Sequence, residues 1–207
     1  MSYDGKRIAV GAENNDSWGQ IIRKYVNDSA LEDYLGASVA ISGDYAIAGT
    51  PGDDSGGSAY ILVRSGGSQT WTQHDKIEAS DEAAGDRFGN SVSISGDYAI
   101  VGAYGDGSYA GSAYIFIRSG TSWSQQQKLT ATDGAAGDVF GLAVSISGSY
   151  AIIGAYGDDS GKGSAYIFDR SGTTWSQQQK LLATDGVAPD NFGISVSIDD
   201  EYAITVS

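Results

Sequence analysis

The chain of 207 residues has no cysteine, one histidine and two prolines. Without cysteine it can form neither a disulfide framework nor a thiolate metal site. Zinc usually takes three or four histidine, cysteine or carboxylate ligands, and two of these residue types are nearly missing. His74 is the only candidate base for a serine-type triad, and no nucleophile-elbow motif accompanies it. We therefore expect a chain that is not an enzyme.

Long apolar runs and basic residues are also scarce. No run approaches the roughly 20 apolar residues of a membrane-spanning helix, and residues 1–7 show no signal peptide. Lysine and arginine number 12 against 26 acidic residues, which gives a formal net charge of −14. Polyanion binding depends on basic residues that displace counterions from phosphate. We therefore expect neither nucleic acid nor anionic membrane as a partner.

A repeat of 52 residues organises what is present. Phe88, Phe140 and Phe192 keep this step (140 − 88 and 192 − 140). The tryptophans at 71, 123 and 175 keep it too. A fixed period of this size indicates a tandem array of one supersecondary unit. We assign a single domain, 1–207, with a degenerate unit at 1–36, complete units at 37–89, 90–141 and 142–193, and closing strands at 194–207.

Each complete unit contains four strand-like runs. In the second complete unit they are 91–94, 98–101, 112–117 and 123–129, here called strands A to D. They alternate in polarity or are rich in β-branched and aromatic residues, and no helical periodicity is found. Such units hide their apolar faces only against one another. The sequence therefore predicts an all-β fold, a β-propeller of about four four-stranded antiparallel blades. A parallel β-solenoid is the alternative, although its repeats are usually shorter.

The first unit is imperfect. Residues 7–12 match strand B of later units loosely, and residues 19–26 match strand C. Leu35-Gly36 stands where Phe-Gly stands later. We interpret the missing piece as strand D. The C-terminal A and B strands are then candidates to share a blade with the first unit and close the ring.

Several motifs of the complete units resemble a known family. Phe88-Gly89, Gly102-Ala103, residues 111–116 and residues 123–129 resemble the FG-GAP repeat, particularly its bacterial and algal variant. The resemblance covers about residues 37–207. Its best-known relative, the integrin α-subunit head, is a β-propeller, so the resemblance implies that fold, protein binding and cell adhesion, and an extracellular or cell-surface location.

That group often carries an Asp-x-Asp-x-Asp-Gly calcium loop between strands A and B. Here the corresponding loops, Ser95–Asp97 and Ser147–Ser149, are too short and carry at most one carboxylate. A calcium ion takes six or more oxygen ligands. We therefore expect no cofactor beyond weak Ca²⁺ binding and assign no metal ligand.

Alternating strand direction brings the B–C and D–A connections to one end of the blades. We predict an acidic face there, able to bind Ca²⁺ weakly or a basic partner. Its candidate residues are Asp53, Asp54, Asp106, Asp133, Asp138, Asp158 and Asp159. The alternative, which we favour, is that these side chains accept hydrogen bonds from turn N–H groups. For Asp138 we expect N–H partners beyond it, in the Phe-Gly turn.

Recurring aromatic and basic residues have two interpretations as well. Trp71, Trp123 and Trp175 open strand D, where they could stack on sugars as glycan platforms or seal the seam between blades. We favour the seam. Tyr114, Phe116, Tyr166 and Phe168 alternate with small or aliphatic residues and predict inter-blade core. The arginines at 64, 118 and 170 should pair with an aspartate of a nearby A–B turn.

Three functional hypotheses follow. The leading one is a non-catalytic protein-interaction or structural module, which assembles with a protein partner or another copy of itself through its incomplete terminal blade. The alternative is a lectin-like, glycan-binding propeller, with or without Ca²⁺. An enzyme built on a carboxylate pair is the third, although no pair stands out.

Overall fold

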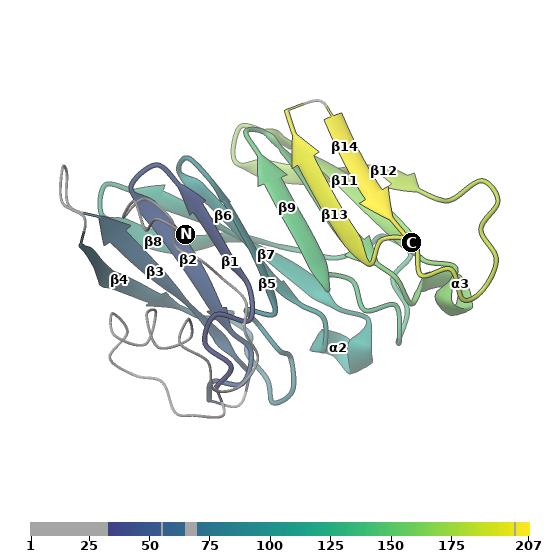
Figure 1. Ribbon diagram of the computed structural model, residues 1–207, viewed down its shortest axis with the longest axis horizontal. Helices are drawn as coiled ribbons and strands as arrows, with labels where there is room; N and C mark the ends of the chain where they lie inside the picture. The colour runs from purple at the N-terminus through teal and green to yellow at the C-terminus, as the bar shows by residue number, and fades with distance from the viewer. Residues whose placement is uncertain (1–32, 55, 65–69, 201) are drawn as a thin grey trace, which may run out of the picture.

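The computed structural model describes residues 33–54, 56–64, 70–200 and 202–207. They form three four-stranded antiparallel sheets and one two-stranded sheet, which follow one another along the molecule (Figure 1). Blade 1 consists of β1 (Val39–Ser42), β2 (Tyr45–Thr50), β3 (Ser58–Arg64) and β4 (Trp71–Ile77). Blade 2 consists of β5 (Ser91–Ser95), β6 (Tyr98–Ala103), β7 (Ser112–Ser119) and β8 (Ser122–Leu129). Blade 3 consists of β9 (Ala143–Ser147), β10 (Tyr150–Ala155), β11 (Ser164–Ser171) and β12 (Thr174–Leu181). The terminal half-blade consists of β13 (Ser195–Asp199) and β14 (Tyr202–Val206).

This arrangement confirms the all-β prediction of four-stranded propeller blades. Every blade is an antiparallel meander whose strand order equals its chain order, so a parallel solenoid is wrong. The first strands, β1, β5, β9 and β13, lie next to one another, and the blades extend from this row toward β4, β8 and β12 (Figure 1). The described residues do not close a ring, because the terminal half-blade pairs with no described strand of blade 1. The strand-like runs at 7–12 and 19–26 lie outside the described residues.

Two short helical turns depart from the strands-only expectation. They are α2 (Asp106–Tyr109) and α3 (Asp158–Gly161), four residues each, in the B–C connections of blades 2 and 3. Both contain residues in the left-handed region, with φ of 61° at Ser108 and 51° at Asp159. They are therefore tight turns that carry an aspartate, not regular helices. No described helix is long and apolar enough to cross a bilayer.

The core lies between the blades. One buried cluster joins blades 1 and 2, and the next joins blades 2 and 3. Tyr114 and Phe116 belong to the first cluster, and Tyr166 and Phe168 to the second, as predicted from their alternation. Phe88 and Phe140 pack edge-on against Tyr114 and Tyr166 respectively, with ring centroids 5.5 Å apart in both pairs. The Phe-Gly phenylalanine thus fills the seam between two blades.

Serine hydroxyls stitch the first strands of successive blades together. Ser93 and Ser95 of β5 accept hydrogen bonds from the N–H groups of Ile146 and Gly148, both at 3.2 Å. One blade further, Ser145 and Ser147 accept hydrogen bonds from the N–H groups of residues 198 and 200, at 3.1 and 3.0 Å. These strands have no backbone partner on that edge in the described sheets, so the serines satisfy part of it.

Glycine permits the closest approach in the middle of each seam. A Cβ atom on Gly102 would lie 1.9 Å from the carbonyl oxygen of Gly141, the glycine of the next Phe-Gly pair. The same contact would be 1.8 Å between Gly49 and Gly89, and 1.9 Å between Gly154 and Gly193. No side chain fits at such distances. The Gly-Ala and Phe-Gly motifs are therefore two halves of one backbone contact.

Glutamines of strand D clasp the tryptophan of the next blade at the outer edge. Trp175 Nε1 donates to Gln126 Oε1 at 3.1 Å. Gln127 holds the backbone of Trp175 from both sides, accepting from its N–H at 2.8 Å and donating to its carbonyl at 2.7 Å. This contact, called here the glutamine clasp, explains the Gln-Gln-Gln motif as an inter-blade lock.

Candidate functional site

A lysine near the end of strand D gathers carboxylates from two connections in each blade. Lys180 Nζ lies 2.5 Å from Asp158 Oδ2 and 2.7 Å from Asp133 Oδ2. Lys128 Nζ lies 2.5 Å from Asp106 Oδ2 and 2.6 Å from Asp81 Oδ2. Each lysine therefore joins a B–C connection to a D–A connection, which places both connections at one end of the blades, as predicted.

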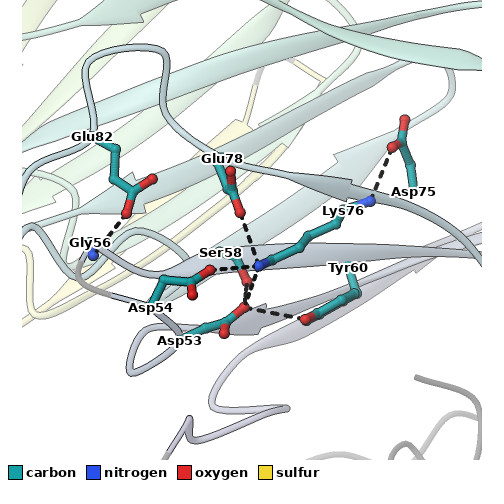
Figure 2. A network of polar contacts seen from close by, with 9 residues as sticks. All are labelled: Asp53, Asp54, Gly56, Ser58, Tyr60, Asp75, Lys76, Glu78 and Glu82. Atoms are coloured by element: carbon teal, nitrogen blue, oxygen red, sulfur yellow. Dashed lines mark hydrogen bonds and ion pairs between the residues drawn. The ribbon is translucent and has the colours of Figure 1, made fainter. Parts of the chain in front are cut away.

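Blade 1 builds the same cluster with a different third carboxylate. Figure 2 shows the ammonium of Lys76 beside Asp53, Asp54 and Glu78, at 3.1, 2.7 and 3.0 Å. Ser58 and Tyr60 of β3 also direct their hydroxyls toward Asp53 Oδ2, the tyrosine at 3.2 Å (Figure 2). The carboxylate of Asp53 is thus satisfied by its own blade.

Serine and tyrosine hydroxyls complete the clusters of blades 2 and 3. Ser112 Oγ donates to Asp106 Oδ2 at 2.5 Å, and Ser164 Oγ donates to Asp158 Oδ2. Tyr166 donates to Asp133 Oδ1 at 3.0 Å. Hydrogen bonds to an ionised acceptor are the strong ones, so each cluster is a rigid polar plug at the blade end.

The electrostatics keep these clusters ionised. Burial alone would lower the pKa of Lys128, but hydrogen bonds to Asp106 and Asp81 outweigh it and raise that pKa. The hydrogen bond from Lys180 lowers the pKa of Asp133. Burial raises the pKa of Tyr166, so this side chain remains a hydrogen-bond donor at neutral pH. Each cluster is therefore a closed set of charges over the neutral pH range.

These contacts locate the seven predicted acidic-face residues. Asp53, Asp138 and Asp158 are buried, while Asp54, Asp106 and Asp133 are paired with a lysine. Within the described part of the chain, Asp159 is the one exposed member with no ion pair. The described residues contain no group of three or more histidine, cysteine, aspartate or glutamate side chains able to hold a metal ion. Most of the acidic end is neutralised internally, and its role in binding stays a prediction.

Aspartates before the Phe-Gly pairs shape the turns in which they lie. Asp138 Oδ2 accepts a hydrogen bond from the N–H of Ala135 at 2.7 Å, and Asp86 Oδ2 accepts one from Ala83 at 2.8 Å. The donor precedes the aspartate by three residues, so the expectation of N–H partners beyond Asp138 is wrong. A local turn satisfies the carboxylate before the chain reaches the phenylalanine.

The tryptophans and arginines line the seams. Trp71, Trp123 and Trp175 are 6%, 7% and 2% exposed, which supports the seam interpretation and leaves little ring face for a sugar. Arg64 and Arg118 pair with Asp44 and Asp97 of the A–B turn in their own blade, the first at 2.7 Å. The guanidinium of Arg170 instead contacts the Ser149 hydroxyl at 3.2 Å and covers the ring of Tyr98 in blade 2.

His74 also lies in a seam. Its ring meets Tyr45 edge-on with centroids 6.1 Å apart, and its Nε2 contacts the carbonyl of Thr121. It stands on β4 and is partly buried, so the expected surface position on a strand holds only in part. No described contact places a serine hydroxyl on this imidazole as a triad would require.

The terminal half-blade differs from the complete blades. Tyr202 and Ile204 are 84% and 64% exposed, whereas Ile100 and Ile152, at the position of Ile204, are fully buried by the following blade. The N–H of Gly193 donates to the carbonyl of Val206 at 3.0 Å, as Gly141 donates to Gly154. Val206 therefore stands where the other blades have the contact glycine. No described strand pairs with the outer edge of β14.

Comparisons with known proteins agree with the repeat pattern. The FG-GAP repeat family matches residues 18–62, 71–116, 123–168 and 175–207. The matched segments begin at Trp18, Trp71, Trp123 and Trp175, which aligns Trp18 with the tryptophans of strand D. Our alignment of 19–26 with strand C disagrees with this frame. No curated protein matches the chain.

Solved structures show a general likeness. The crystal structure of the Saccharomyces cerevisiae Sqt1 matches with a TM-score of 0.48 at 10% identity, over 75% of this chain and 36% of that chain. The N-terminal domain of Nup159 matches with a TM-score of 0.42 at 11% identity, over 77% of this chain and 35% of that chain. The four family matches together cover most of the sequence, from Trp18 to Ser207. The chain belongs to the FG-GAP repeat family.

Proposed function

We propose that this chain is a non-catalytic protein-interaction module that assembles through its terminal half-blade. The observation that carries the proposal is the contrast between Ile204, which is exposed, and its buried equivalents Ile100 and Ile152. The exposed equivalent becomes buried once another polypeptide covers it. Apolar surface gathered on one sheet marks an interaction site more often than scattered exposed residues do.

The edges of the sheets support the same proposal. The outer strands β4, β8 and β12 carry lysine and glutamine, and each has a register shift against its neighbour. Lysines and bulges are the usual means of protecting an edge strand from pairing with other chains. The edge strand β14, Tyr-Ala-Ile-Thr-Val, has no charge, no proline and a regular register with β13. It retains the features that favour strand addition.

The family also suggests where such a module works. The resemblance to adhesion proteins leads us to propose an extracellular or cell-surface location and a protein partner. The partner that can be tested directly is a second copy of the chain, because pairing two apolar β14 edges requires no other protein.

A proline at the open edge tests the proposal. Val206 directs its carbonyl toward β13, so strand alternation directs the N–H of Ala203 toward the open edge. We expect the wild-type chain to increase in mass with concentration in sedimentation equilibrium, and Ala203→Pro to remain a monomer with unchanged circular dichroism. Ala203→Ser, which keeps the N–H group, should associate like the wild type. A wild-type chain that stays monomeric throughout the micromolar range contradicts assembly with itself.

A further inference from the structure

We infer that the terminal half-blade and the outer edge of blade 3 together form a socket for a C–D strand pair of this repeat type, one that carries a tryptophan at the start of its second strand. This inference rests on the proposed function and names the chemistry of the partner. It comes from two separate observations, the open edge of β14 and an empty glutamine clasp on β12.

The filled clasp defines what the socket recognises. Between blades 2 and 3, Gln126 accepts the indole N–H of Trp175, and Gln127 bonds the backbone N–H and carbonyl of the same residue. Trp175 is 2% exposed. Only a residue with a ring N–H in an extended backbone makes all three bonds. The clasp is therefore specific for a tryptophan in a β-strand.

Gln178 and Gln179 repeat this arrangement on β12. Gln179 pairs with Ile167 as Gln127 pairs with Ile115, and each strand has its register shift at the preceding glutamine. In blade 2 the two side chains are partly buried by the next blade, whereas Gln178 and Gln179 are exposed. Neither has a hydrogen-bond partner among the described residues. The clasp of blade 3 is formed but empty.

The open edge of β14 lies where the rest of the same blade would begin. In complete blades the second strand pairs with the third, and the third with the strand that carries the tryptophan. A third strand added to β14 would therefore bring a fourth strand beside β12, with its tryptophan at Gln178. The socket continues the seam that already joins blades 2 and 3, so a C–D strand pair satisfies both features at once.

A peptide from the chain itself is the probe. Residues 164–181 contain β11, the connecting turn and β12, and thus the strand pair with Trp175. We expect the fluorescently labelled peptide to bind the full chain saturably in anisotropy titrations. Gln178→Ala in the chain, or Trp175→Ala in the peptide, should each weaken binding about tenfold, since each removes hydrogen bonds of the clasp. Ser176→Ala in the chain, an exposed position of the same strand, should bind like the wild type.

The outcomes separate this inference from the proposed function. Peptide binding that depends on Gln178 supports the socket even if the chain does not associate with itself. Absence of binding overturns the socket, as does binding that Gln178→Ala and Trp175→Ala leave unchanged. If the chains associate through Ala203 while Gln178→Ala has no effect, the assembly stands and the edges pair symmetrically instead, which also overturns the socket.

Discussion

His74 and Gln126 occupy equivalent positions in successive blades but make different contacts. Gln126 accepts the indole N–H of Trp175 at 3.1 Å. The corresponding indole N–H of Trp123, opposite His74, is buried and has no hydrogen-bond partner. A buried donor without an acceptor costs about 1–3 kcal/mol. The seam between blades 1 and 2 is therefore weaker at its outer edge than the seam between blades 2 and 3.

This difference predicts unequal effects of the same truncation. Gln126→Ala should lower the free energy of unfolding by about 1–2 kcal/mol, because it leaves the buried Trp175 donor unsatisfied. His74→Ala should lower it less, because Trp123 has no acceptor to lose. Urea denaturation followed by tryptophan fluorescence measures both. Equal losses at the two positions would contradict the role of the glutamine clasp.

Among the elements, the lysine clusters dominate the electrostatics of the blade ends. Lys180 joins Asp158, which is buried, to Asp133, which is half-exposed. Replacing one partner of such a group leaves unpaired carboxylates behind. We expect Lys180→Met to lower the free energy of unfolding by about 2 kcal/mol at pH 7, between the values for exposed and buried pairs. Lys162→Met serves as control, because Lys162 is exposed and has no ion pair among the described residues.

The effect of Lys180→Met should depend on pH. In the wild type the pKa of Asp133 is lowered, so its stabilisation is complete above the unfolded pKa and disappears as pH falls through the folded pKa. Without the ammonium, two adjacent carboxylates resist ionisation, so the folded pKa rises and the cost grows with pH. The difference between wild type and variant should therefore shrink from pH 7 to about pH 3. Thermal unfolding at both pH values tests this, and an unchanged difference would count against it.

The elements themselves could be predicted from the sequence because their signals are local. Alternation along each strand, the tight A–B turns and the fixed spacing of Phe140 and Trp123 identify the blade without knowledge of its neighbours. The clusters could not be predicted in the same way, because Lys128 meets Asp81 across 47 residues. A signal was present, since Lys76, Lys128 and Lys180 also repeat every 52 residues (128 − 76 and 180 − 128). Recurring charge indicated structural pairing, not a ligand site.

Boundaries between units were harder to predict than the units. The degenerate first unit offers loose matches to more than one strand, and only the tryptophan step sets its frame at Trp18. The direction of the Asp138 hydrogen bond was also missed, because an aspartate can serve N–H groups on either side of a turn. The glutamine clasp needed the structure, since its partners lie on different blades.

At the scale of the whole molecule, charge opposes the assembly that the strand edge favours. Each chain carries a formal net charge of −14, while β14 carries none. Repulsion between chains is screened as the Debye length falls from about 10 Å at 0.1 M salt to about 3 Å at 1 M. We therefore expect self-association to strengthen as sodium chloride rises, measured by sedimentation equilibrium. Weaker association in high salt would indicate that ion pairs, not the apolar edge, hold the assembly.

Val206 also limits how far an array of this kind can grow. Every earlier blade accepts the backbone of the following repeat against a bare glycine, at a spacing that leaves no room for a methyl group. At the final sheet that place is taken by an isopropyl side chain. An additional repeat cannot settle there in the same register. Growth by identical addition therefore stops at this sheet, and the surface is kept for a differently shaped guest.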